Sequence, residues 1–148
     1  MIRFICIGLI LGLTNCSSNL EKGKSQLGVK VIEVGPQKLY LIREVRGLNY
    51  DVTKVSVSKD VCAVIRDSSA ISLNPDIAFY YRVINDSLYA YTTSEEIKDK
   101  WEKMAFPFSS NIKYLSAIDH VAFKRSIQNV EFEAIEVPID ENLNCENK

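Results

Sequence analysis

Histidine is the side chain that most often serves as a general acid, general base or metal ligand at neutral pH, and this chain has one, His120. Asp119 precedes it, but neighbouring side chains on a helix or strand point in different directions. The sequence contains no G-x-S-x-G nucleophile motif, no H-E-x-x-H motif and no glycine-rich phosphate loop. Metal sites usually need several His or Cys ligands at close spacing. We therefore expect a non-catalytic protein without metal or cofactor, with His120 on its surface.

Carboxylates come close together near the C-terminal end, at Glu131, Glu133 and Glu136. Such a group could serve acid–base chemistry or bind Ca²⁺. Alternate residues of a strand share a face, so Glu131 and Glu133 would lie side by side on a strand. We interpret them as the solvated outer face of a sheet.

The four cysteines are Cys6, Cys16, Cys62 and Cys145, and the first two belong to the N-terminal stretch described below. Cys62 lies in an apolar run and Cys145 in a polar tail. A disulfide between them would close a long loop and stabilise the fold by about 4–5 kcal/mol in the chain-entropy model. Alternatively, Cys62 is a buried free thiol. The sequence leaves both alternatives open.

Aromatic side chains gather in residues 77–93, IAFYYRVINDSLYAYTT. Two runs of alternating pattern flank an Asn-Asp pair at 85–86. Such a pair is typical of a two-residue turn, which predicts a β-hairpin.

One face of this hairpin is the candidate binding face. The predicted register places Arg82 opposite Tyr89 and Tyr80 opposite Tyr91. Tyr and Arg are enriched at binding hot spots because they combine a large contact area with a polar tip. A binding role predicts that all four side chains are exposed. The alternative is that the aromatic pairs stabilise a covered sheet.

The N-terminal stretch, MIRFICIGLILGLTNC, combines a basic Arg3 with an uncharged apolar run over residues 4–13. A transmembrane helix needs about 20 apolar residues, so this run is too short to span a bilayer. A short apolar run behind a basic start is typical of a secretory signal peptide.

The run ends in Leu13-Thr14-Asn15-Cys16, which resembles the lipobox of bacterial lipoproteins, where a Leu lies three residues before an invariant Cys. The match departs at Asn15, because the family usually has Gly, Ala or Ser there. The resemblance implies that residues 1–15 are removed and that Cys16 is lipidated. The alternatives are a plain secretory signal or an uncleaved anchor.

The implied location is the bacterial cell envelope, with the exported protein held at a membrane by lipid and the outer membrane favoured over the inner. Stable attachment needs two membrane signals, and acyl chains on Cys16 would supply them. The chain has 18 basic and 19 acidic side chains and a net charge of −1. This balance lacks the basic excess of nucleic-acid-binding proteins.

The length fits one domain. We expect a flexible tether over 16–27, a single globular domain over 28–139 and a polar tail over 140–148. The spacing of turns predicts a β-rich α+β fold, in which one antiparallel sheet of about six or seven strands, sandwich- or barrel-like, is joined by one or two short helices. The expected strands cover 28–34, 38–46, 50–58, 61–66, 77–84, 87–93 and 126–137.

Helical periodicity begins at Thr93, where Thr93 and Glu96 form a capping-box pattern, and continues to Ala105. Residues 111–125 are ambiguous between a second helix and two short strands. The apolar phase of the third strand slips near residues 53–54, which predicts a bulge there.

No motif in the body of the chain selects an activity. The favoured hypothesis is a non-catalytic binding module of the cell envelope, whose partner is a protein or an envelope polymer. The alternative is a structural or assembly lipoprotein of a membrane complex. A small envelope enzyme is the least favoured.

Overall fold

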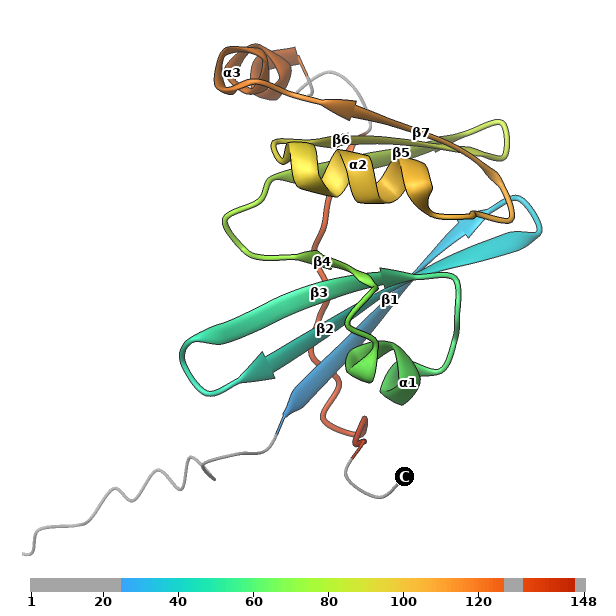
Figure 1. The fold of residues 1–148 in the computed structure, drawn as a ribbon, viewed down its shortest axis with the longest axis vertical. Helices are drawn as coiled ribbons and strands as arrows, with labels where there is room; N and C mark the ends of the chain where they lie inside the picture. The colour runs from blue at the N-terminus through green and yellow to red at the C-terminus, as the bar shows by residue number, and fades with distance from the viewer. Residues whose placement is uncertain (1–24, 127–131, 146–148) are drawn as a thin grey trace, which may run out of the picture.

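The computed structural model describes residues 25–126 and 132–145. Their eight strands form two four-stranded sheets, which lie one above the other in Figure 1, and three short helices connect strands within the sheets. The fold is β-rich, as predicted. The expected single sheet of six or seven strands is wrong, and the described strands do not close into a barrel. Residues 1–15, Cys16 and most of the expected tether lie outside the described residues.

The first sheet is an antiparallel meander in the order β1-β2-β3-β4. Its strands are β1 (Gln26–Val34), β2 (Gln37–Arg46), β3 (Tyr50–Ser56) and β4 (Ile71–Leu73). A two-residue turn joins β1 to β2, and its first residue, Gly35, has φ +58°, which glycine adopts without strain. Strand β1 begins at Gln26, two residues before the expected start of the domain at residue 28.

The bulge expected in β3 is absent, because β3 pairs with β2 without interruption from Tyr50 to Ser56. Four consecutive residues of β3, from Thr53 to Ser56, are buried. Val55 belongs to the core between the sheets, and Lys54 lies on the opposite face against a helix. The apolar phase changes because both faces are covered.

That helix is α1 (Val61–Arg66), which replaces the strand expected at 61–66. The Asp60 carboxylate accepts the backbone N–H of Ala63 at 3.1 Å and caps its start. At its end, the ammonium of Lys54 donates to the carbonyl oxygens of Val64, Ile65 and Asp67 at 3.3, 2.6 and 2.7 Å. Partners at both ends stabilise a helix of only six residues.

The second sheet has the order β7-β6-β5-β8 and is mixed, because β6 and β7 run parallel. Its strands are β5 (Phe79–Ile84), β6 (Ser87–Thr92), β7 (Ser109–Tyr114) and β8 (Glu133–Ala134). The strand expected over 126–137 is wrong in extent, because only two of the described residues there pair as a strand.

The predicted β5–β6 hairpin is confirmed in its register. Arg82 pairs with Tyr89, and Tyr80 pairs with Tyr91. Both turn residues have positive φ, 47° at residue 85 and 58° at residue 86, as a type I′ turn requires.

Helix α2 (Glu95–Lys103) connects the parallel strands β6 and β7. The Ser94 hydroxyl accepts the N–H of Ile97 at 3.3 Å, so the helix is capped one residue later than the expected Thr93 box. Ile97 and Trp101 are buried in the core between the sheets.

Helix α3 (Ala117–Ser126) follows β7, so residues 111–125 are part strand and part helix. It has no buried residue. Figure 1 shows α3 and α1 at opposite ends of the molecule. None of the helices in the described ranges is long and apolar enough to cross a membrane.

Candidate binding cleft

The C-terminal segment, residues 133–145, connects the two sheets, and we call it the strap. Figure 1 shows it running from the upper sheet down across the lower one. It starts as β8, where Glu133 pairs with Tyr81 on the edge of β5. It then reaches the edge of β1, where the N–H of Asp140 donates to the carbonyl oxygen of Leu27 at 2.7 Å. The strap therefore joins the edges of two different sheets.

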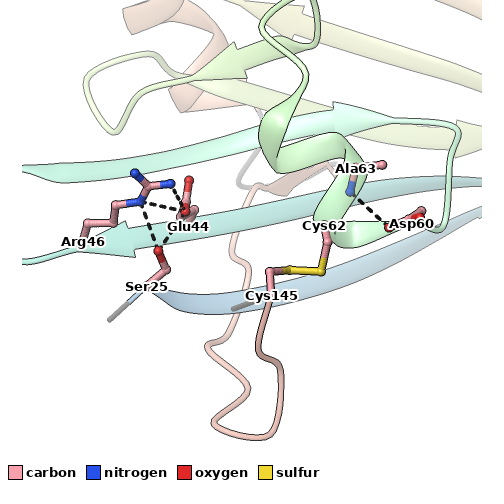
Figure 2. The surroundings of a disulfide bond; sticks show 7 residues. All are labelled: Ser25, Glu44, Arg46, Asp60, Cys62, Ala63 and Cys145. Carbon is pink, nitrogen blue, oxygen red and sulfur yellow. Dashed lines mark hydrogen bonds and ion pairs between the residues drawn. A yellow bond between two sulfur atoms is a disulfide. The ribbon is translucent and has the colours of Figure 1, made fainter. Parts of the chain in front are cut away.

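The strap ends at a disulfide between Cys145 and Cys62, which closes a loop over 83 positions of sequence. Figure 2 shows this bond joining the strap to the first turn of α1 on the outer face of the first sheet. Of the two alternatives left open by the sequence, the structure has the disulfide. The expected polar tail is thus covalently attached to the domain.

The strap crosses β1 at very close range beside Gly28. A Cβ atom at this position would lie 2.0 Å from the carbonyl oxygen of Pro138. Because that oxygen belongs to the backbone, it cannot move aside as a flexible side chain can. Only glycine allows the crossing.

A cleft of about 1040 Å³ lies beside this crossing and is lined by residues of both β1 and the strap. Its walls come from β1, β2, β3, the end of β4, the connection to β5, the start of β5, and the strap. Such a concave site, mostly apolar with a few convergent polar groups, is the usual form of a binding site. Its apolar lining includes Leu73, Ile77, Phe79 and Val137, and its polar lining includes Lys30, Arg43, Asp51, Thr53, Asn74 and Glu136.

A bidentate ion pair between Arg43 and Asp51 forms part of the cleft wall. The guanidinium Nε and Nη2 donate to the two carboxylate oxygens at 2.9 and 2.6 Å. The hydrogen bond from Arg43 holds the pKa of Asp51 below its ordinary value. Nη1 of Arg43 also donates to the Val137 carbonyl at 3.3 Å, which ties the strap to the first sheet.

A second polar group links the strap to both sheets. The Glu133 carboxylate accepts the Tyr81 hydroxyl at 2.5 Å and the Lys30 ammonium at 3.1 Å. The Tyr81 hydrogen bond, followed by that of Lys30, lowers the pKa of Glu133. Burial, assisted by the nearby carboxylate, raises the pKa of Tyr81. Both cations in the cleft are therefore neutralised by carboxylates.

The main chain of β1 is open on the side that faces the strap. The carbonyl oxygen of Leu27 points to the strap, and alternate residues of an antiparallel strand direct their N–H and C=O groups to the same side. The main-chain groups of Val29, Val31 and Glu33 therefore point away from β2. In residues 25–126 and 132–145 they have no hydrogen-bond partner.

The predicted binding face is largely covered. Tyr80 is only 8% exposed, Arg82 and Tyr91 are half-buried, and Tyr89 is 39% exposed. The expectation of four exposed side chains is therefore wrong, most clearly for Tyr80.

Aromatic packing from α3 and from Phe132, the residue before the strap, explains this burial. The Phe123 ring lies 5.3 Å from the Tyr80 ring and 4.7 Å from the Tyr91 ring, between centroids. Phe132 contacts Tyr91 edge-on at 5.1 Å, and the Arg82 guanidinium lies over its ring at 5.9 Å. The face acts as a platform for α3, in line with the covered-sheet alternative.

His120 takes part in this packing and is half-buried. Its Nε2 lies 3.0 Å from the Tyr80 hydroxyl, at hydrogen-bond distance. Of the carboxylates singled out in the sequence, Glu131 lies outside the described residues, Glu133 binds Lys30 and Tyr81, and Glu136 lines the cleft. In the part of the chain that the structure describes, no three His, Cys, Asp or Glu residues come together as a metal site.

The cleft itself was not predicted from the sequence. Its walls come from segments up to about a hundred positions apart, so no local motif marks it. The one local signal was Gly28 at the start of an apolar strand, since glycine in a strand often marks close approach of another backbone. Comparisons with protein-family models, curated proteins and solved structures found no match to this chain.

Proposed function

We propose that the protein is a lipid-anchored, non-catalytic binding module of the cell envelope, and that the cleft between β1 and the strap is its binding site. The observation that carries the binding role is the cleft itself, with its apolar lining and a few paired polar groups. The proposed anchor rests on the lipobox-like Leu13-Thr14-Asn15-Cys16 alone. A tethered module would meet its partner at a high local concentration.

Site-specific photo-crosslinking in cells tests the binding role. A benzoylphenylalanine at Asn74, an exposed residue of the cleft wall, should give an adduct with the partner. The same photo-reactive residue at the exposed Lys59, which does not line the cleft, is the matched control. An adduct specific to position 74 supports the proposal. No adduct at position 74, or the same adduct at both positions, contradicts it.

The intact mass of protein extracted from membranes tests the anchor. A chain that begins at Cys16 and is heavier by diacylglyceryl and acyl groups supports it. An unmodified chain cleaved elsewhere contradicts it, and the protein would then be a free secreted binding module.

A structural or assembly role is the second candidate, and one observation favours it. Helix α3 exposes Ile118 and Val121, which are 83% and 53% exposed. The two residues lie three positions apart and are therefore neighbours on the helix surface. Exposed apolar side chains that lie together in this way are typical of a protein contact. Co-purification of a membrane complex in stoichiometric amount, lost in the Ile118→Asp variant, would support this role over the first.

A further inference from the structure

Strand β1 lies at the edge of its sheet, and within residues 25–126 and 132–145 the main-chain groups of Val29, Val31 and Glu33 have no hydrogen-bond partner. Unpaired N–H and C=O groups on an edge strand are a template for another strand. Proteins commonly protect such edges with short strands, proline or bulges, and β1 has none of these over its nine residues. Lys30, the nearest cation, forms an ion pair with Glu133.

The strap closes one end of this edge. The closed end is the crossing, where Asp140 bonds to Leu27 and Pro138 lies against Gly28. Past the crossing, the cleft is lined by β1 at residues 29–31 and by the strap at residues 134–138. The six residues from Val29 to the end of β1 offer about 20 Å of strand length. One extended segment of about six residues can therefore add along this edge, with one end beside the cleft.

We propose that the cleft binds one extended peptide segment of a partner protein, which adds as a strand to β1 beside Val29, Val31 and Glu33. The inference rests on the proposed binding function and names the class of ligand. Main-chain hydrogen bonds to the edge supply affinity, and alternate side chains of the peptide enter the cleft. Because Arg43 and Lys30 already have carboxylate partners, the side chains that enter beside Phe79 are apolar and uncharged.

The geometry favours a single peptide over a second copy of this chain. A second copy would bring its own strap to the same edge, and its sheet would meet the strap of the first copy at residues 27–28. A single extended segment needs only the open edge beyond the crossing. Self-association through β1 is therefore an outcome that overturns the proposal.

The Val31→Pro variant tests the proposal. The N–H of Val31 points away from β2, so proline removes a donor that faces the cleft and leaves the β1–β2 hydrogen bonds in place. Val31→Ala is the control, because it shortens the same side chain and keeps the N–H. The probe is a peptide selected on the wild-type protein from a phage-displayed random library. Val31→Ala measures the side-chain contribution by itself, and we expect Val31→Pro to weaken binding at least about tenfold more than Val31→Ala does.

A second measurement keeps the test decisive if the proline variant fails to fold. Two versions of the selected peptide are compared, one N-methylated at its odd-numbered amides and the other at its even-numbered amides. The version whose methylated amides face β1 should lose binding, and the other should bind as the unmodified peptide does. The bound peptide should also slow amide hydrogen exchange at residues 29, 31 and 33.

Four results would overturn the inference. They are equal binding to Val31→Pro and wild type, peptide-induced protection elsewhere than on β1, no peptide selected, and protection of β1 that rises with protein concentration alone. The crosslinking experiment separates this failure from that of the proposed function. Adducts at position 74 that contain lipid or glycan and no peptide would support the binding function and contradict the peptide as its ligand.

Discussion

Lys54 is a buried charged residue whose role is structural. It is 8% exposed, and its ammonium satisfies three carbonyl oxygens at the end of α1. The last carbonyl groups of a helix lack a partner in a following turn, although that of Val64 also accepts the N–H of Asp67 at 3.1 Å. A cation near a helix C-terminus also interacts favourably with the helix dipole. Through α1, Lys54 also supports Cys62 and hence the end of the strap.

We therefore expect Lys54→Met to lower the free energy of unfolding by about 2–4 kcal/mol, because it leaves buried acceptors unpaired. Lys59→Met changes an exposed lysine five residues away and should change stability by less than about 0.5 kcal/mol. Urea denaturation with the disulfide intact measures both. Equal, small effects of the two substitutions would contradict this role for Lys54.

Asp51 gives a prediction about pH. Its hydrogen bond from Arg43 lowers its pKa below the ordinary 3.8, so the pair stabilises the fold above that value and loses this contribution as the pH falls through the lowered pKa. The stability difference between wild type and Asp51→Asn should therefore shrink between about pH 5 and about pH 2. Because both side chains are about one-third exposed, the contribution is less than about 1 kcal/mol. Urea titrations at low salt measure the difference, and an increase on acidification would contradict the prediction.

At the scale of the elements, α3 is held to the second sheet through few contacts. It has no buried residue, and Phe123 is its main contact with the aromatic platform of Tyr80 and Tyr91. Its sequence lacks a strong amphipathic pattern, so its position depends on this ring.

The Phe123→Ala variant should lower the free energy of unfolding by about 1–2 kcal/mol, less than for a fully buried ring, because Phe123 is half-buried. It should also expose Tyr80 to solvent. Val121→Ala on the outer side of the same helix is the control and should have almost no effect. Thermal unfolding and Tyr accessibility to tetranitromethane measure the two effects. Unchanged Tyr80 accessibility would show that α3 is not its cover.

Elements with a local signal were predictable from the sequence. The β5–β6 hairpin followed from alternation around Asn85-Asp86, and α2 followed from its helical period. Helix α1 was missed because a six-residue, nearly all-apolar segment fits a strand equally well, and its capping partner Lys54 lies in another element. The two-residue β8 and the strap depend on pairing with distant strands, which no local pattern encodes. For the same reason, the aromatic face was recognised but its cover by α3 was not.

At the scale of the whole molecule, the strap and its disulfide determine how the two sheets are held together. The strap contacts β5, β1 and α1 in turn, and Cys62–Cys145 fixes its far end. A cross-link over 83 positions removes much conformational entropy from the unfolded chain.

Replacing both cysteines, Cys62→Ser with Cys145→Ser, should lower the free energy of unfolding by about 4–5 kcal/mol in the chain-entropy model. Amides of residues 140–145 should exchange faster, whereas those of the β5–β6 hairpin should change little below the global unfolding limit. Reduction of the wild-type protein should reproduce the loss of stability. A double variant as stable as wild type would contradict the structural role of the bond.

The central claim is that the strap leaves one edge of β1 open beside the cleft, and amide hydrogen exchange in the free protein tests it most directly. NMR-detected exchange should be fast at Val31 and Glu33, whose N–H groups face away from β2. It should be slow at Lys30 and Ile32, whose N–H groups point toward β2. Alternating fast and slow amides along β1 are the predicted result. Uniformly slow exchange across all four residues would show that the edge is already covered, and would contradict both the open cleft and the strand addition proposed for it.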